Sequence, residues 1–504
     1  MLSIIKSIAL QGLDGFLINV EVDISAGMPC WEVVGLPDTN IKESKERVKT
    51  AIKNCGIELL SRKYIINLSP ANIRKTGAIL DLAIAVAILR SMNIIHNEKL
   101  ERTVFIGELS LDGKVNRVNG ILPMCIECIK NNIEEVIIPK SNVKEVNFIN
   151  GIKLIGVENL KQVIDFLNNK IEIKSEKVEK KIMETFENME IDFKDVKGHK
   201  FAKRALEISA SGGHNCLLIG SPGSGKTMMS KRIPSILPDL TFEEALEITK
   251  IHSILGLTAN DGLITKRPFR CPHHNITETA LIGGGRIPKP GEVSLAHLGV
   301  LYLDELLEFN RNIIEVLRIP LEDKKVNISR INSCISYPSN FMLIGSMNPC
   351  PCGYYGSREK ECSCSELQRK NYISKLSGPM LDRFDMHIFV SSINYNEMNE
   401  VNTESSNQIR SRVNKARKLQ QERYKKYNIY SNSELTPRLI EKFCKLNSNT
   451  KNILEKTIEK WNLSTRAYIK ILKLSRTIAD LEGTSNINEN HILEAIQYRK
   501  LERR

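Results

Sequence analysis

The stretch that most constrains the fold is residues 214–227, which read HNCLLIGSPGSGKT. Its first half is a short apolar strand pattern, and its second half matches the phosphate loop G-x-x-x-x-G-K-[ST]. Glycines let backbone N–H groups turn toward phosphate oxygens, the lysine carries the charge that faces the β- and γ-phosphates, and the threonine hydroxyl is a magnesium ligand. The stretch predicts a nucleotide-binding α/β domain with a cradle formed by Gly220, Ser221, Pro222, Gly223, Ser224, Gly225, Lys226 and Thr227.

Two later apolar strand patterns end in polar residues that suit the same site. Residues 299–305 read GVLYLDE, and we expect Asp304 to help hold Mg²⁺ while Glu305 orients and deprotonates the attacking water. Residues 341–348 read FMLIGSMN, and we expect Asn348 to hydrogen-bond the γ-phosphate or that water. A turn-forming asparagine before a proline is the alternative. With the phosphate loop, these residues predict ATP hydrolysis with Mg²⁺ as cofactor.

Two arginines are candidates for stabilising the charge that develops on the transferred phosphoryl group. Arg383 lies in SGPMLDRFD at residues 377–385, and Arg466 lies in LSTRA at residues 463–467, where a long helical pattern begins. Spacing alone does not choose between them, nor does it separate either one from an arginine in a surface ion pair.

Around these motifs the sequence divides into four parts. Residues 1–168 alternate strand and helix patterns, and residues 169–192 alternate Lys and Glu as in a solvated linker. Residues 193–395 alternate strands and helices, which indicates a parallel sheet, and residues 396–504 are helical throughout. In the first part we expect strands near 18–24, 33–34, 64–68, 103–106 and 135–138, and helices near 40–54 and 81–89.

The composition is that of a globular protein with an uneven charge. The chain has 504 residues, 41% of them hydrophobic, and a net charge of +13. Residues 401–504 carry 22 basic and 11 acidic residues, which indicates either a phosphate-binding face or a lysine-rich solvated surface. We find no apolar run long enough for a membrane span and no secretory signal, and we therefore expect a cytoplasmic protein with reduced cysteines.

Four cysteines are candidate zinc ligands. They form two C-x-C pairs within fifteen residues, so their four thiolates can surround one Zn²⁺ if the chain between the pairs folds back. The commoner spacing in zinc sites is C-x₂-C. Four reduced thiols in a loop are the alternative. A C-x-x-C pair, Cys125 and Cys128, lies in a helical pattern that favours core packing. His273 and His274 lie between Pro272 and the Gly-rich run at 283–285, which is typical of a structural or pore loop rather than of metal ligands. The candidate ligands are Cys350, Cys352, Cys362 and Cys364.

Five motifs, in chain order, resemble those of the magnesium-chelatase-like AAA+ ATPases, in particular the ComM/YifB competence branch. The motifs are GSPGSGKT, LYLDE, SMNPCPCG, LSGPMLDRFD and LSTRAYIKILKLSRTIADLEG. Four other stretches, GLPD, NLSPANIR, GELSLDG and RCPHH, extend the resemblance over nearly the whole chain. It implies a Lon-protease-like (S5-type) α+β domain at 1–168, an AAA+ P-loop α/β domain at 193–395 and a helical lid at 396–504.

The resemblance also implies an assembly and roles for single residues. It implies a homo-hexameric ring with ATP bound between neighbouring subunits, in which Arg383 is the arginine finger and Arg466 is the sensor-2 arginine of the lid. The remaining catalytic and binding residues act within one subunit. The branch is associated with DNA branch migration during recombination of transforming DNA, so the resemblance implies a DNA helicase or translocase.

The resemblance also bears on the activity of residues 1–168. A Lon protease needs a nucleophilic serine and a lysine base. The matching stretches, KTGAILD at 75–81 and VNGILPM at 118–124, have neither where the dyad belongs. We therefore predict that this domain has no peptidase activity and is a DNA- or partner-binding platform.

In magnesium-chelatase-like and MCM-like proteins a hairpin that can touch DNA follows the LYLDE strand. The basic residues at that point are Lys324, Lys325 and Arg330, with residues 283–286 (GGGR) as a second candidate and an ordinary exposed hairpin as the alternative.

Two other functions remain open. A magnesium-chelatase or MoxR-like ATPase would remodel a protein or metal-insertion partner without DNA. A nucleotide-gated DNA-binding scaffold is disfavoured, because a site that only binds ATP has no use for Glu305 or for the two arginines.

Overall fold

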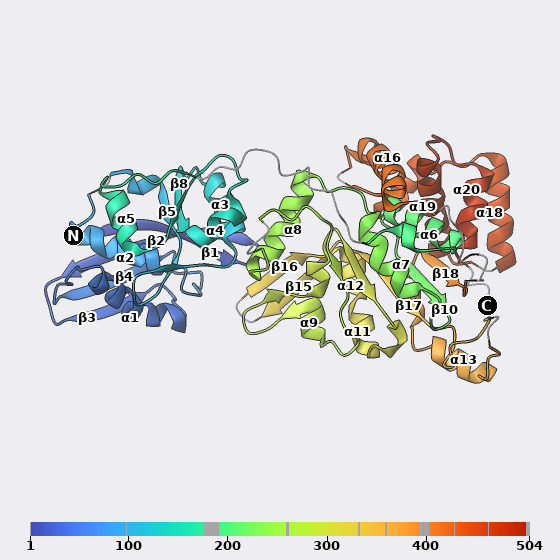
Figure 1. The fold of residues 1–504 in the computed structure, drawn as a ribbon, viewed down its shortest axis with the longest axis horizontal. Helices are drawn as coiled ribbons and strands as arrows, with labels where there is room; N and C mark the ends of the chain where they lie inside the picture. The colour runs from blue at the N-terminus through green and yellow to red at the C-terminus, as the bar shows by residue number, and fades with distance from the viewer. Residues whose placement is uncertain are drawn as a thin grey trace. The chain divides into compact units, whose positions relative to one another are not determined.

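The computed structural model describes the whole chain except residues 1, 97, 176–190, 259–261, 331–332, 358–359, 394–396, 398–402, 428, 462 and 500–504. The chain divides into two compact units (Figure 1). Unit 1 comprises Met1–Thr185 and Phe242–Thr265, and unit 2 comprises Phe186–Thr241 and Lys266–Arg504. Most of the expected linker, residues 169–192, lies outside the described residues.

Unit 1 is built on a seven-stranded mixed sheet with the order β3-β4-β2-β1-β5-β8-β9. β2 pairs antiparallel with β1 and β4, and the remaining pairings in this sheet are parallel. The strands are β1 Ser3–Gln11, β2 Asp14–Ser25, β3 Cys30–Val34, β4 Lys63–Ser69, β5 Thr103–Phe105, β8 Glu135–Pro139 and β9 Lys153–Val157. The helices are α1 Thr39–Asn54, α2 Asp81–Ser91, α3 Ile121–Lys130, α4 Lys140–Val146 and α5 Leu160–Leu167.

A helix from the middle of the chain completes unit 1. Sequence patterns group α8, Phe242–Ile254, with the nucleotide-binding part, whereas the structure packs it against α3. The carboxylate of Glu145, almost fully buried, accepts hydrogen bonds from Ser253 Oγ at 2.5 Å, Thr258 Oγ1 at 2.7 Å and Arg117 Nη2 at 3.0 Å. A buried carboxylate needs such partners, so these contacts fix residues 242–258 to unit 1.

Unit 2 contains the predicted parallel sheet. Its order is β11-β14-β17-β10-β18, and every pairing is parallel. The strands are β10 Cys216–Gly220, β11 Phe269–Arg270, β14 Val300–Leu303, β17 Met342–Met347 and β18 Met386–Val390. The helices before the lid are α6 Lys200–Gly212, α7 Lys226–Arg232, α9 Glu278–Ile282, α10 Glu292–Leu295, α11 Arg311–Val316, α12 Arg318–Asp323, α13 Glu366–Ile373 and α14 Gly378–Leu381.

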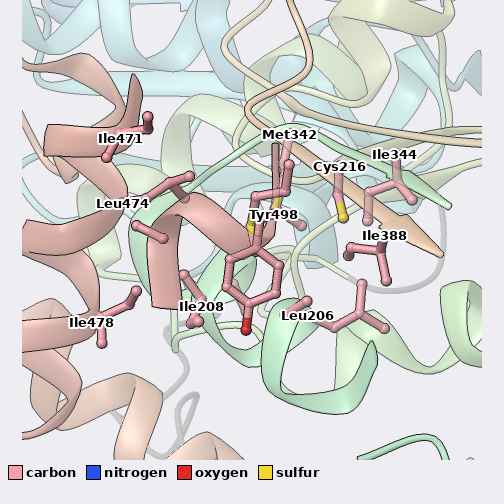
Figure 2. Packing of buried hydrophobic residues seen from close by; sticks show 14 of the residues in the cluster. Leu206, Ile208, Cys216, Met342, Ile344, Ile388, Ile471, Leu474, Ile478 and Tyr498 are labelled. Atoms are coloured by element: carbon pink, nitrogen blue, oxygen red, sulfur yellow. The ribbon is translucent and has the colours of Figure 1, made fainter. Parts of the chain in front are cut away.

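The C-terminal lid is helical, as expected, and shares one hydrophobic core with the sheet. Apolar side chains of α6 and α19 pack with those of β10, β17 and β18 (Figure 2). The lid helices are α16 Ser406–Tyr424, α17 Pro437–Phe443, α18 Ser448–Trp461, α19 Thr465–Leu481 and α20 Glu489–Gln497. None of the described helices has the length and apolar character that a membrane crossing needs. The α/β class with a helical lid is confirmed.

Candidate nucleotide-binding site

The phosphate loop joins the C-terminal end of β10 to the start of α7 and requires its glycines. Gly223 and Gly225 have φ angles of +77° and +81°, which L side chains rarely adopt. At Gly220 a Cβ would lie 2.3 Å from the carbonyl oxygen of Val390, which leaves no space for a side chain. The amine of Lys226 donates to the carbonyl oxygen of Gly220 at 2.7 Å, so the lysine lies within the loop.

The predicted magnesium ligands lie together at the edge of the sheet. Thr227 Oγ1 donates to Asp304 Oδ2 at 2.9 Å, and Lys226 Nζ lies 3.4 Å from Asn348 Oδ1. Burial lowers the pKa of Lys226, against the opposing effect of Asp304 and Glu305. Burial alone would raise the pKa of Asp304, but hydrogen bonds led by that of Ser346 hold it below its usual range. Asp304 is therefore a carboxylate at neutral pH.

Glu305 is held beside Asp304 through its backbone. Its φ of +52° is left-handed, and its N–H donates to Asp304 Oδ1 and to Ser346 Oγ, both at 3.1 Å. Ser346 lies on β17, the strand next to β14, so two neighbouring strands fix this turn. The Glu305 side chain is exposed.

A cavity of about 470 Å³ contains Glu305 and Asn348 together with residues that sequence analysis did not assign to the site. His274 belongs to the loop predicted to be structural or to line a pore, Glu308 lies in the short 3₁₀ turn Leu306–Glu308, and Tyr372 lies on α13. These residues reach the cavity from three separate segments and carry no sequence signal of their own. The other cavity-lining residue is Asn275.

A second cavity, of about 320 Å³, lies beside the phosphate loop, next to Gly225. It is lined by residues 198–202, by residues 389–392 at the end of β18, and by Glu397. A Cβ built on Gly225 would lie 3.3 Å from His199 Nε2, and this buried nitrogen makes no hydrogen bond to the described residues. This cavity therefore lies next to the phosphate loop, and His199 Nε2 is a buried polar atom between the two.

The two candidate arginines lie at the opposite edge of the sheet. β18 runs parallel to β10 with Met386 beside Cys216, so Arg383 precedes the start of β18 while the phosphate loop follows the end of β10. Asn215 Nδ2 donates to the carbonyl oxygen of Arg383 at 3.0 Å. Five residues of strand therefore separate Arg383 from Gly220, about 16 Å. The Arg383 guanidinium pairs with Glu322 of α12.

Arg466 belongs to the same edge as Arg383. It is the second residue of α19, and its guanidinium donates to Asp382 Oδ2 at 3.3 Å. One turn further on, Lys470 Nζ lies 3.2 Å from Asp385 Oδ1 and donates to the carbonyl oxygen of Phe384 at 2.9 Å. These contacts tie the Arg383 loop to the lid.

The four candidate zinc ligands lie together. The Sγ atom of Cys350 is 3.3 Å from that of Cys352 and 3.6 Å from that of Cys362, and the four sulfur atoms, including that of Cys364, all lie within 4.8 Å of one another. A tetrahedral site with Zn–S bonds of about 2.3 Å places sulfur atoms about 3.8 Å apart. The donor set therefore fits Zn²⁺ in kind and in spacing. Cys125 and Cys128, by contrast, are buried in the core of unit 1, as predicted.

Two small hairpins carry the predicted DNA contacts. β15 Lys325–Arg330 pairs with β16 Ser333–Pro338, and β12 Gly283–Gly284 pairs with β13 Lys289–Pro290. Lys325 and Arg330 are exposed, and so are the other hairpin cations, Arg286 and Lys289. Lys324 instead ends α12 with a φ of +57°, and burial lowers its pKa. A Cβ on Gly283 would lie 3.0 Å from Ile328 Cδ1, so the two hairpins touch.

Comparisons with known proteins agree with this arrangement. Family models for the magnesium chelatase subunit ChlI match residues 192–398 and 20–142, and a model for the ChlI C-terminal region matches residues 403–499. The whole chain is 39% identical to the competence protein ComM of Haemophilus influenzae and 41% identical to YifB of Escherichia coli, in each case over 98% of the relative. A shorter match, 28% identical over 32% of each chain, is to Lon protease 2 of Bacillus subtilis. The chain therefore belongs to the magnesium-chelatase-like AAA+ family, in the branch of ComM and YifB.

Proposed function

We propose that this protein hydrolyses ATP. The observation that carries the proposal is the 2.9 Å contact between Thr227 and Asp304 beside a polar cavity that contains Glu305 and Asn348. Thr227 and Asp304 would hold Mg²⁺, which when bound neutralises charge on the β- and γ-phosphate oxygens. Lys226 binds those oxygens, Asn348 orients the γ-phosphate or the water, and Glu305 accepts the proton of the water.

We infer that the site is completed by a second copy of the chain. Arg383 lies about 16 Å from its own phosphate loop, at the other end of the strands, and therefore serves a neighbouring subunit as arginine finger. Arg466 is tied to the same loop and acts from the same edge. A closed ring, which we take to be a hexamer, supplies each nucleotide with these two cations. The cavity around His199 accepts the base of the nucleotide.

The substrate on which the motor acts is, we propose, single-stranded or branched DNA. The touching hairpins present Lys325, Arg330, Arg286 and Lys289 to solvent, and such cations bind phosphates without reading bases. Lys324 has less support as a contact, because burial lowers its pKa. The relative ComM is named a competence protein, which favours branch migration in the recombination of transforming DNA, a process of the cytoplasm.

The test is ATP turnover with and without forked and four-way-junction DNA. We expect DNA to stimulate turnover and salt to weaken binding. Replacing both Lys325 and Arg330 by alanine should make the negative slope of log affinity against log salt shallower by about 1.4 for single strands. Alanine at Lys415 and Lys418 on α16 removes the same charge from the basic lid, and we expect it to leave the slope unchanged; an equal change of slope would place phosphate contacts on the lid instead. ATP turnover that ignores DNA would instead favour an ATPase that remodels a protein partner.

Two further proposals concern residues outside the ATP site. We propose that Cys350, Cys352, Cys362 and Cys364 hold a structural Zn²⁺, which elemental analysis of the purified protein measures. We also propose that unit 1 is not a peptidase. Lys75 is fully buried, and its amine donates to the carbonyl oxygens of Gly35 and Pro70 rather than to a hydroxyl. ATP-dependent cleavage of an unfolded protein by the purified chain would contradict this.

A further inference from the structure

The loop that carries the four cysteines touches the phosphate loop. The first of them, Cys350, follows Asn348 by two residues. Gly353, buried next to Cys352, lies so close to the phosphate loop that a Cβ on it would be 2.6 Å from Cδ of Pro222. The same Cβ would lie 4.0 Å from Cγ of Asn348. The cysteine loop therefore packs against Pro222 of the phosphate loop with no room for one more carbon atom, and Asn348 lies nearby.

The other end of the cysteine loop leads into the catalytic cavity. After Cys364 the chain enters α13, where Arg369 donates to the carbonyl oxygen of Cys364 at 3.3 Å and stacks on the ring of Tyr355, with 4.3 Å between the guanidinium carbon and the ring centre. Tyr355 in turn donates its N–H to Cys350 Sγ at 3.3 Å. Three residues beyond Arg369, Tyr372 lines the cavity that contains Glu305. The cluster thus holds α13 at one side of the ATP site.

We propose that the metal bound by these four cysteines positions the ATP site, so that ATP turnover depends on an ion that never touches the nucleotide. The metal, Zn²⁺ from its all-sulfur donor set, closes the cysteine loop and thereby fixes Pro222 on one side and Tyr372 on the other. Both are positioning contacts rather than catalytic ones. The inference rests on the proposed ATPase function and adds to it a requirement for the metal.

Two glycines in the cysteine loop provide a matched pair of variants that keep all four ligands. Gly353 and Gly356 have φ angles of +84° and +79°, so Gly353→Ala and Gly356→Ala introduce the same methyl group with similar backbone strain. The methyl group at 353 meets Pro222, whereas none of the residues that the structure describes lies within 4 Å of the one at 356. A displacement of about 1 Å in an active site can cost on the order of 10²-fold in rate. We expect Gly353→Ala to lose at least about tenfold in turnover at full zinc content, and Gly356→Ala to stay within about twofold of the unaltered protein.

Removal of the metal gives a second, independent measurement on the unaltered protein. Zinc is extracted with an organomercurial and a chelator, the thiols are regenerated, and ATP turnover is measured before and after Zn²⁺ is restored. We expect turnover to fall at least about tenfold and to return with the ion. A metal-free protein that hydrolyses ATP at the original rate overturns the inference, and so does equal turnover of the two alanine variants.

Failure of the proposed function is distinguishable from failure of this inference. If the zinc-loaded unaltered protein does not hydrolyse ATP, the proposed function fails. Binding of a fluorescent ADP analogue then still compares Gly353→Ala with Gly356→Ala. Weaker binding by the former alone supports contact-dependent positioning of the phosphate loop, and equal binding contradicts it.

Discussion

The assignment of the general base can be tested within a single cavity. Glu305 and Glu308 both line it and both are exposed, so position in the cavity alone does not separate them. The difference is that the backbone N–H of Glu305 is held at 3.1 Å by Asp304 and Ser346, next to the proposed magnesium ligand. The change Glu305→Gln keeps the size of the side chain and those backbone hydrogen bonds, and removes only the proton acceptor.

The size of the effect follows from that role. General acid–base catalysis by a positioned side chain contributes about 10²–10⁴-fold, which corresponds to about 2.7–5.5 kcal/mol of activation free energy. We therefore expect turnover of Glu305→Gln to fall by that factor. ATP binding is preserved, because Lys226, Thr227 and Asp304 are unchanged and the removal of a negative charge near the triphosphate favours its binding.

The assay is steady-state phosphate release at saturating ATP, together with titration of a fluorescent ATP analogue. The matched control is Glu308→Gln, which removes the same charge from the same cavity, and for which we expect less than a tenfold loss. The reasoning is refuted if Glu305→Gln keeps turnover within a few-fold of the unaltered protein, or if Glu308→Gln is the slower variant.

Three other perturbations test the arrangement. Arg383→Ala is expected to bind ATP but to lose about 10³-fold or more in turnover; mixing it with Glu305→Gln should restore some activity, and no rescue at any ratio would contradict a site shared between subunits. Glu145→Ala leaves the partly buried guanidinium of Arg117 without its carboxylate, which should lower the free energy of unfolding by about 3–5 kcal/mol. Hydrogen exchange in α8 should then accelerate by on the order of 10²-fold. Burial alone would raise the pKa of the Asp385 carboxyl, but Lys470 holds it well below its usual range. Its charge therefore stabilises the fold above about pH 4, and this contribution is lost as pH falls; the destabilisation by Asp385→Asn, measured by urea unfolding, should shrink in the same direction.

Much of the ATP site is predictable because its residues follow strands that run in one direction. The phosphate loop is contiguous in sequence, and the carboxyl ends of β10, β14 and β17 meet at one edge, which brings Asp304 and Asn348 to Lys226 and Thr227. His274 and Tyr372 are different. Each reaches the cavity from a segment whose position depends on packing between distant parts of the chain, and short polar segments have no periodic signal that reports such packing.

The fold of unit 1 shows the same limit. The strands and helices predicted before residue 140 lie where the structure has them, but β1 is not among the predictions. Its sequence SIIKSIALQ groups apolar residues side by side instead of alternating them, so the two-residue period of a strand is absent. The docking of α8 is also unpredictable, because the contacts that fix it are made by Ser253 and Thr258, residue types common in any loop. Lys324 illustrates a third limit, since the left-handed turn that redirects it is invisible in a run of charged residues.

The position of the long hairpin suggests how DNA and ATP are coupled if DNA binds there. β15 follows α12, whose Glu322 pairs with Arg383, and the N–H of Ser339, after β16, donates to the carbonyl oxygen of Lys324 at 2.8 Å. The base of the hairpin and the loop that carries Arg383 are thus in contact through α12. From the same stem the chain enters β17, which runs about 20 Å to Asn348. If Arg383 serves a neighbouring subunit as proposed, a force on the hairpin would reach two nucleotides: that of the same chain through β17, and that of the neighbour through Arg383. On that arrangement, binding of DNA and hydrolysis at two adjacent sites would be mechanically linked rather than independent.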